Sequence, residues 1–311
     1  MAEPPSRPPS RDDVERARAA IGGRLNRTPL LTSRTFGARI KAELFQRTGS
    51  FKPRGALNRI SHLTEDERRR GVIGISAGNH AQAVAFAAAE AGTDALVVMW
   101  KTASEQKIAA TRGYGAEVDL EASGPAEAFE RLHELIEQTG RTLVHPFDDP
   151  LVIAGAGTVG LEIEEDAPDA DAVLVGVGGG GLVSGIQTAI GHRTRVVAVE
   201  PELSTALHTG LEHGEPTPVQ PASIADGLSA PFAGRLALEI CRDLERVLVT
   251  EEEIEHAFRL LYERAKLAVE PAAAVAAAAW FAGKVQAERP VLLASGGNVA
   301  RQTAAAILAR P

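Results

Sequence analysis

The stretch AVLVGVGGGGLVSG, residues 172–185, joins a short apolar run to four consecutive glycines and the start of a second apolar segment. Residues 172–177 are apolar or glycine at every position, which is typical of a strand covered on both faces. The glycines at 178–181 allow a tight turn into a helix that begins at Leu182. Strand, glycine loop and helix in this order predict one unit of a parallel α/β sheet.

The same alternation of short apolar runs and amphipathic segments continues from Gly71 to the end of the chain. Continuous apolar strands separated by helices predict a doubly wound α/β protein with parallel sheets. The expected strands are residues 72–76, 95–100, 117–120, 143–145, 172–177, 196–200, 247–249 and 291–294. The expected helices are residues 79–91, 104–112, 125–138, 152–165, 182–190, 251–266, 271–287 and 299–308.

Three polar loops that contain glycine follow predicted strands, at residues 76–80, 178–181 and 295–298. Ligands of doubly wound folds bind beyond the carboxyl ends of the strands. A sheet of eight or more strands can also divide into two lobes. We therefore expect the three loops to share one cleft.

The composition argues against several classes of partner. The 33 basic and 41 acidic residues give a formal net charge of -8, with no basic run, so nucleic acid and anionic membranes are not expected partners. The single cysteine, Cys241, excludes an internal disulfide and is expected to be a buried thiol.

The ends of the chain and its most apolar segment bear on location. Residues 1–12 are rich in proline and polar residues, so they are expected to form a disordered tail and do not resemble a signal peptide. The longest apolar stretch, near residues 271–281, is too short to cross a bilayer. A cytoplasmic protein is expected.

The four glycines at 178–181 have two interpretations. Glycines let the backbone approach a ligand closely, and the amides at the start of the following helix favour an anion such as a phosphate. However, Gly176, Gly178 and Gly181 also satisfy G-x-G-x-x-G, and Glu200 lies at the end of the next strand, as in a dinucleotide site. This stretch alone is compatible with both a phosphate monoester and a nicotinamide cofactor.

Lys52 stands between Phe51 and Pro53 in a chain that has only six lysines but 27 arginines. Apolar surroundings lower the pKa of a lysine and make the free amine available for a Schiff base. A solvated surface lysine is the alternative.

Two further loops are candidates for ligand contacts. The loop at 76–80 (Ser-Ala-Gly-Asn-His) opens a helix, where its donors would suit a carboxylate, although Ser76 or Asn79 could simply cap that helix. His80 could act as a general base or could be a packed histidine. Residues 295–298 (Ser-Gly-Gly-Asn) could bind a ligand or form only a turn.

Taken together, these segments resemble a known family. GSFKPRGA at 49–56, SAGNHAQAVA at 76–85, GVGGGGLVSG at 176–185 and ASGGN at 294–298 are similar in order and spacing to pyridoxal-phosphate-dependent threonine/serine dehydratases and serine racemases. These have the tryptophan-synthase-β-like fold, also called fold type II. The likeness extends to HPFDDPLVIAGAGT at 145–158, VVAVEP at 196–201, IADGL at 224–228 and KLAVEPAAA at 266–274, and it covers nearly the whole chain from Arg27 onward.

The resemblance implies pyridoxal phosphate as the cofactor and Lys52 as the catalytic lysine that forms its Schiff base. Asn79 would contact the ring hydroxyl, Ser295 the pyridine nitrogen, and the glycine loop the phosphate. The implied cofactor-binding residues are Phe51, Lys52, Asn79, Gly178, Gly179, Gly180, Gly181, Leu182, Gly227 and Ser295. The implied loop for the substrate carboxylate is Ser76, Ala77, Gly78, Asn79 and His80.

The resemblance also implies an organisation. Residues 13–52 and 146–311 would form a large cofactor-binding domain, residues 53–145 a small domain that carries the substrate loop, and the cofactor would lie in the cleft between them. Residues 146–149 and 224–228 are expected to set the side-chain pocket. Relatives suggest a homodimer.

The departures from the family pattern narrow the expected activity. Racemases of this family have a second catalytic serine where this chain has Ala77. The family's metal site pairs a glutamate with an aspartate, but here Glu200 is the only matching ligand and Ala206 takes the other place, so no metal is expected. Because the sequence ends at Pro311, soon after the last predicted helix, the regulatory domain of biosynthetic threonine dehydratases is not expected.

The implied reaction is β-elimination of a small β-hydroxy amino acid, L-threonine or L-serine, to a 2-oxo acid and ammonia. A serine at the ring nitrogen makes the cofactor a weaker electron sink than an aspartate would, which favours elimination. A nicotinamide-dependent oxidoreductase, a serine racemase and a hydroxyaspartate dehydratase are the alternatives.

Overall fold

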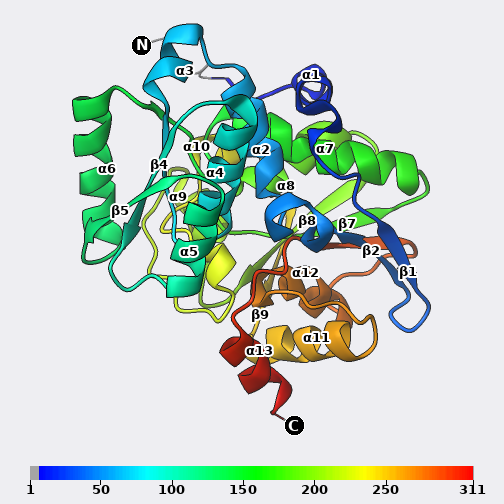
Figure 1. The fold of residues 1–311 in the computed structure, drawn as a ribbon. Coiled ribbons are helices and arrows are strands. Elements are labelled where there is room, and N and C mark those ends of the chain that lie inside the picture. Colours follow the sequence, from blue (N-terminus) through cyan, green and yellow to red (C-terminus); the bar gives the residue numbers. More distant parts are fainter. Residues whose placement is uncertain (1–6, 311) are drawn as a thin grey trace.

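The computed structural model describes residues 7–310, which form two β-sheets flanked by helices (Figure 1). The larger sheet has six strands in the order β1-β2-β10-β7-β8-β9, and the smaller has four in the order β5-β4-β3-β6. The predicted fold class, α/β with two parallel-sheet lobes, is confirmed. One edge strand departs from it, because β1 (Leu30–Ser33) runs antiparallel to β2 (Ala38–Ala42).

The remaining strands agree with the expected ones to within two residues at each end. They are β3 (Val72–Ile75), β4 (Ala95–Trp100), β5 (Glu117–Ala122), β6 (Thr142–Leu143), β7 (Ala172–Gly176), β8 (Arg195–Pro201), β9 (Glu245–Val249) and β10 (Pro290–Ala294). The strand expected at 143–145 fits least well, because only residues 142 and 143 pair with β3.

Most helices also lie where the pattern predicts them. They are α4 (Asn79–Ala91), α5 (Glu105–Gly113), α6 (Pro125–Thr139), α7 (Pro150–Asp166), α8 (Gly181–Ile190), α11 (Glu251–Glu263), α12 (Pro271–Phe281) and α13 (Arg301–Leu308). Helix α12 ends six residues before the predicted end at 287, because Ala282 caps it and Gly283 follows with a φ of 68°.

Alternate side chains of the larger sheet enter two separate cores. Leu174 of β7 packs in the core that contains α11 and α12, whereas its neighbours Val173 and Val175 pack in the core that contains α7 and α8. Helix α12 consists mostly of buried alanines, and a helix that is apolar on all sides is expected to be buried. Because both faces are covered, the central strands β7 and β10 are buried at every position and carry no polar side chain, as the sequence pattern indicated.

The smaller sheet is built in the same way. Val72 and Val97 share a core with α4, whereas Ile73 and Val98 share one with α6. Helix α2 (Lys52–Ser61) packs against both α4 and α7, so it lies between the elements of the two sheets (Figure 1).

The expected disordered tail at 1–12 requires correction. Residues 1–6 lie outside the described residues, but helix α1 (Arg11–Ile21) begins inside the predicted tail. Ser10 caps α1 by accepting a hydrogen bond from the amide of Asp13, and the Asp13 carboxylate accepts one from the amide of Ser10. This capping box is a local signal that the proline-rich context obscured.

Several elements were not predicted at all. They are β1, β2, α1, α2, α3 (Glu65–Arg70), α9 (Ala206–His213) and four short 3₁₀ segments, η1 (Gly22–Arg24), η2 (Glu43–Phe45), η3 (Arg47–Gly49) and η4 (Asp226–Leu228). Most are short and carry few apolar residues in periodic positions, so pattern reasoning has little to detect. Helix α10 (Arg235–Ile240), by contrast, falls on the helical pattern LALEICRDL at 236–244, which contains Cys241.

Candidate active site

The three predicted loops each follow a strand end in the structure. Ser76 follows β3, Gly178 lies two residues after β7, and Ser295 follows β10 directly. Because β3 belongs to the smaller sheet and the other two strands to the larger, the site draws on both sheets.

The loop at 295–298 connects the other parts of the site. The carbonyl of Ser295 accepts a hydrogen bond from the amide of Phe51 at 3.1 Å, and Ser50 pairs with Gly296 in an isolated β-bridge. Asn298 donates through Nδ2 to Oδ1 of Asn79 at 2.8 Å. The structure therefore brings the segment of Lys52, the segment of Asn79 and the 295–298 loop together.

Lys52 is the first residue of α2, and its Nζ atom is enclosed by protein. Nζ donates to the carbonyl of Pro146 at 2.9 Å and lies 5.1 Å from the centre of the Phe51 ring. Burial lowers the pKa of Lys52 to about 8, a shift that the negative charge of Glu270 partly opposes. The alternative of a solvated surface lysine is therefore wrong.

A fully buried lysine elsewhere in the chain makes the comparison informative. Lys41 is fully buried, but its Nζ forms an ion pair with Glu162 at 2.7 Å and lies 3.6 Å from Asp166. Carboxylates pair with the Lys41 amine, whereas the Lys52 amine contacts a neutral carbonyl. Of these two enclosed lysines, Lys52 is the one that can offer a free amine as a nucleophile.

The glycine loop presents enclosed backbone donors. Among residues 7–310, no group accepts a hydrogen bond from the amides of residues 178–182, although four of these five residues are buried. Gly180 adopts a φ of 90°, a conformation that favours glycine, and α8 begins at the next residue. Enclosed amides at a helix start fit an anion such as a phosphate.

Glycine is required in this loop also because the protein packs closely around it. A Cβ atom at Gly179 would lie 2.3 Å from the Phe147 ring, one at Gly178 3.0 Å from the backbone of Leu228, and one at Gly180 2.4 Å from Ala237. Phe147 follows Pro146, the residue whose carbonyl holds Lys52. The glycine loop and Lys52 are thus joined through two consecutive residues.

The loop at 146–149 supports the site structurally, and its expected role in setting the substrate pocket stays a prediction. Phe147 is buried against the glycine loop. Asp148 accepts hydrogen bonds from the first amides of α10, at Arg235 and Leu236, and Asp149 caps α7. These side chains are engaged in holding neighbouring elements.

Asn79 is held from two sides. Its Nδ2 donates to Oε1 of Glu270 at 2.7 Å, while its Oδ1 accepts from Asn298. Its side chain does not cap α4, so that alternative is wrong. One hydrogen of Nδ2 remains for a further acceptor.

Glu270 is a site residue that the sequence analysis did not identify. It lies at the N-cap of α12, is almost fully buried, and has a pKa raised to about 7, chiefly by burial and also by the negative charge of Asp226. A Cβ atom on Gly227 would lie 3.5 Å from its carboxylate. The sequence feature that could have identified Glu270 is a single glutamate before the proline of an otherwise apolar run, LAVEPAAA.

His80 and Ser76 stabilise the loop that contains them. Nε2 of His80 hydrogen-bonds to the carbonyl of Val144 at 2.8 Å, and burial lowers the pKa of His80 to about 3, so the ring is neutral near pH 7. The His80 ring is therefore packed in the protein as a hydrogen-bond donor, which agrees with the alternative of a packed histidine. Ser76 Oγ accepts a hydrogen bond from the amide of Gly78 at 3.0 Å, which closes a turn before α4.

Known proteins resemble this chain in sequence and in fold. The family described as pyridoxal-phosphate dependent enzyme matches residues 22–297. The chain belongs to this family.

Individual relatives cover almost the whole chain. The catabolic L-threonine dehydratase TdcB of Escherichia coli (strain K12) is 42% identical over 304 residues, covering 93% of this chain and 92% of that protein. The protein of the same name from Staphylococcus aureus (strain USA300) is 41% identical over 305 residues, covering 92% and 88%. Among solved structures, a T.th. threonine deaminase has a TM-score of 0.88 at 40% identity, covering 94% of this chain and 99% of that chain. Maize serine racemase has a TM-score of 0.89 at 33% identity and covers 95% of both chains.

The residues of this pyridoxal-phosphate-dependent enzyme fit its cofactor. The enclosed amides of the glycine loop suit a phosphate, and Lys52 suits an aldehyde carbon. The buried Ser295 hydroxyl makes no hydrogen bond within residues 7–310, so it is free to donate. Leu182 is buried at the start of α8 beside the same amides.

The alternative of a nicotinamide cofactor is wrong. The family is pyridoxal-phosphate dependent, and Glu200 is not available for ribose hydroxyls. Its buried carboxylate accepts hydrogen bonds from the amides of Leu207 at 2.7 Å and His208 at 2.9 Å, which places it at the start of α9.

Three further observations concern other ligands and the membrane. Within the described part of the chain, no group of three or more His, Cys, Asp or Glu side chains could hold a metal ion. No helix in the same residues is long and apolar enough to cross a membrane. Cys241 is a buried free thiol.

Proposed function

We propose that this enzyme is an ammonia-lyase that converts a small β-hydroxy amino acid, L-threonine or L-serine, to a 2-oxo acid and ammonia. The observation that carries the proposal is the enclosed Lys52 amine, which has no carboxylate partner among residues 7–310. It lies near the glycine loop, whose backbone amides have no acceptor among the same residues. The similarity to threonine dehydratases and a threonine deaminase supports this class of reaction.

The cofactor would be held by residues from several elements. Lys52 would bind it covalently, with Phe51 and Gly227 alongside. The amides of Gly178, Gly179, Gly180, Gly181 and Leu182 would hold the phosphate. Asn79, oriented by Glu270 and Asn298, would direct its remaining N–H toward the ring hydroxyl, and Ser295 would face the ring nitrogen.

The substrate carboxylate would bind at the start of α4. Among residues 7–310, no group accepts a hydrogen bond from the amides of residues 79–81, and the Ser76 hydroxyl can still donate while it accepts from Gly78. A helix of 13 residues also favours a negative charge at its N-terminus. Ser76, Ala77, Gly78, Asn79 and His80 would form this carboxylate site.

Pyridoxal phosphate supplies an electron sink for the bonds at the substrate Cα. Lys52, with its lowered pKa, would take the Cα proton as a free amine. The electron pair of the C–H bond then forms the Cα–Cβ double bond, and the bond from Cβ to the hydroxyl oxygen breaks. The departing hydroxyl takes up one proton and leaves as water, which balances the proton that Lys52 accepts from Cα. The enamine produced takes up water and releases ammonia, so the net products are the 2-oxo acid and ammonia.

A keto-acid assay across a panel of β-hydroxy amino acids tests the proposal. Threonine, serine and threo-3-hydroxyaspartate should be compared under identical conditions with the cofactor-saturated enzyme. Turnover of threonine or serine is the expected result. Selective turnover of hydroxyaspartate would support that alternative, and no 2-oxo acid from any member would contradict the proposed reaction.

Elimination should dominate over racemisation with L-serine. Racemisation needs an acceptor on one face of Cα and a donor on the other. Lys52 can serve one face, but the methyl group of Ala77 cannot serve the second. We expect pyruvate to form at least about tenfold faster than D-serine, on the scale of the roughly 10²–10⁴-fold contribution of a positioned proton-transfer group.

Ala77→Ser is the matched variant for this prediction. It should increase the ratio of D-serine to pyruvate, measured in the same reaction by chiral chromatography. If the unmodified enzyme forms D-serine as fast as pyruvate, another group must provide the second proton.

Uptake of the cofactor by the apoenzyme should depend on pH in a specific way. Only the free amine of Lys52 reacts, and its pKa is about 8 rather than the usual 10.5. At pH 7 about a tenth of the amine is then free, against about 0.03% for an ordinary lysine. The uptake rate, followed by visible absorbance, should rise up to about pH 8 and level off above. A rate that still rises steeply at pH 10 would indicate an unperturbed lysine.

The organisation of the enzyme follows the same proposal. We place residues 13–52 and 146–311 in a large cofactor-binding domain and residues 53–145 in a small domain, with the cofactor between them. An ion pair between Lys107 of α5 and Asp226 of η4 at 2.7 Å links elements on the two sides. We propose a cytoplasmic location, because the buried Cys241 is a free thiol that needs no oxidising compartment. A homodimer is proposed by analogy with the family. Light scattering of the purified enzyme tests the dimer.

A further inference from the structure

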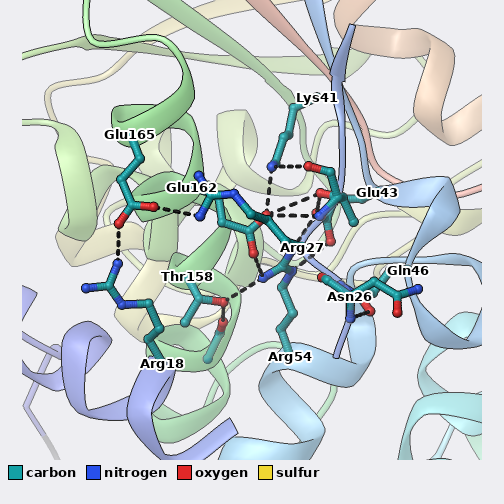
Figure 2. Close-up of polar contacts among 12 residues, drawn as sticks. Arg18, Asn26, Arg27, Lys41, Glu43, Gln46, Arg54, Thr158, Glu162 and Glu165 are labelled. Carbon is teal, nitrogen blue, oxygen red and sulfur yellow. Dashed lines mark hydrogen bonds and ion pairs between the residues drawn. The ribbon is translucent and has the colours of Figure 1, made fainter. Parts of the chain in front are cut away.

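Four buried charged side chains meet beneath the first turn of α2, outside the proposed catalytic machinery. They come from β2, η2, α2 and α7, and Figure 2 shows them converging from these separate elements. The four residues are Lys41, Glu43, Arg54 and Glu162, and we call them the buried charge cluster. Their side chains are between 0% and 12% exposed, and two positive charges face two negative ones.

Arg54 is the centre of the buried charge cluster. Its Nε and Nη2 atoms each donate to one oxygen of Glu43 at 2.8 Å. Its Nη1 atom donates to Glu162 at 2.8 Å and to the hydroxyl of Thr158 at 3.1 Å (Figure 2). All three guanidinium nitrogens are engaged, in the planar fork geometry that a lysine cannot reproduce.

The acidic partners of Arg54 are themselves oriented. Lys41 donates to the second oxygen of Glu162 at 2.7 Å. The hydroxyl of Thr28 donates to Glu43 at 2.5 Å. A guanidinium placed between two restrained carboxylates has little freedom to move.

Stability alone does not account for such a cluster. Removing four charged groups from water is costly, and well-packed apolar residues of similar volume often stabilise a protein at least as well. What an ion-pair network provides in addition is a defined geometry. That property matters here because Arg54 lies two residues after Lys52 in the same helical turn.

The first turn of α2 depends on this anchor. No side chain caps the helix at Phe51, and Lys52 itself makes one polar contact within residues 7–310, with the carbonyl of Pro146. Glu43 directly follows β2 of the larger sheet, and Glu162 lies on α7, which packs against α8. Helix α8 begins at the glycine loop.

We propose that Arg54 is a positioning residue for Lys52, which fixes the first turn of α2 relative to the glycine loop through its forked contacts with Glu43 and Glu162. This inference rests on the proposed role of Lys52. In this role Arg54 contacts neither the substrate nor the cofactor. Its contribution is to the placement of the Lys52 amine, and a displacement of about 1 Å can reduce turnover about 100-fold.

The test compares Arg54→Met and Arg54→Lys with Arg11→Met in the cofactor-saturated enzyme. Arg11 forms a partly buried ion pair with Glu164 at 2.6 Å, also on α7, but lies on α1. Each variant is assayed at a temperature at which far-UV circular dichroism shows it folded. The measurements are kcat, KM and the visible circular dichroism of the bound cofactor, which reports its orientation.

We expect Arg54→Met to lower kcat about 100-fold with a change in KM of less than about threefold, and to alter the visible circular dichroism. Arg54→Lys should lower kcat at least about tenfold, because the charge without the fork does not fix the turn. Arg11→Met should lose stability but keep kcat within about twofold. If Arg54→Met does not fold, Arg54→Lys and Glu43→Gln decide the question.

A folded Arg54→Lys or Arg54→Met enzyme with unchanged kcat and visible circular dichroism would overturn the inference. Equal losses of kcat in Arg54→Met and Arg11→Met would do so too, since they would indicate a general loss of stability. Failure of the proposed function is distinguishable: the unmodified enzyme would then form no 2-oxo acid or lack the lysine-bound absorbance, or the Lys52→Ala variant would retain that absorbance.

Discussion

Lys52→Ala should remove both the visible absorbance of the lysine-bound cofactor and nearly all turnover. The substitution deletes the amine that binds the cofactor and takes the Cα proton, and no other described group is placed to replace it. The remaining buried lysine, Lys41, is held by Glu162, and His80 is neutral and donates to the carbonyl of Val144. We expect kcat to fall by about 10⁴-fold, the upper end of the contribution of one positioned proton-transfer group.

The measurement is the absorbance spectrum after dialysis, followed by the 2-oxo acid assay. Lys284→Ala is the matched control, since Lys284 is a partly exposed lysine that pairs with Glu253 at 2.7 Å, far along the chain from the glycine loop. The control should keep the spectrum and the activity. A Lys52→Ala protein that retains the lysine-bound absorbance would show that a different residue binds the cofactor.

Gly179→Ala is expected to weaken both folding and cofactor binding. A Cβ atom at this position would lie 2.3 Å from the Phe147 ring, so the loop must move. Overpacking of this kind lowers the free energy of unfolding by about 1–3 kcal/mol. Displaced amides would also lose contact with the phosphate, and the loss of one hydrogen bond to a charged group corresponds to a Kd for pyridoxal phosphate about 10- to 100-fold higher.

Two comparisons make this prediction specific. Gly113→Ala, at the end of α5, meets nothing within 4 Å and should leave both quantities unchanged. The double variant Gly179→Ala/Phe147→Leu should recover part of the lost stability, because the smaller side chain relieves the contact. Chemical denaturation and fluorescence titration provide the two measurements. Unchanged stability and affinity in Gly179→Ala would mean that the loop is not anchored as the structure indicates.

The glycine loop alone was compatible with two cofactors. The family match excludes the nicotinamide cofactor, and the buried Glu200 carboxylate instead accepts two amides at the start of α9. Enclosure of Lys52 without a carboxylate partner among the described residues is the property that makes its amine chemically distinct from that of Lys41.

Much of the architecture was determined by local sequence. Helix α4 has the predicted bounds, because small apolar residues follow a glycine-containing turn and another glycine ends the helix. Strand β7 was predictable because a strand covered on both faces must be apolar at every position. The loops at 178–181 and 295–298 lie at one edge of the larger sheet, as expected because parallel strands present their carboxyl ends to the same edge. The loop at 76–80 follows a strand of the other sheet, so its approach to them depends on how the two sheets pack.

Only the tertiary structure decided which distant side chains meet. Asn79 and Glu270 are 191 residues apart, and the bonds of Arg54 to Glu43 and Glu162 span 11 and 108 residues. Periodicity reports which face of an element is buried, but it does not report which element covers that face. A buried carboxylate therefore appears in the sequence only as a polar residue within an apolar run. Its partner and its pKa depend on how the two sheets and α2 pack together, and that is why Glu270 and the buried charge cluster emerged only from the folded chain.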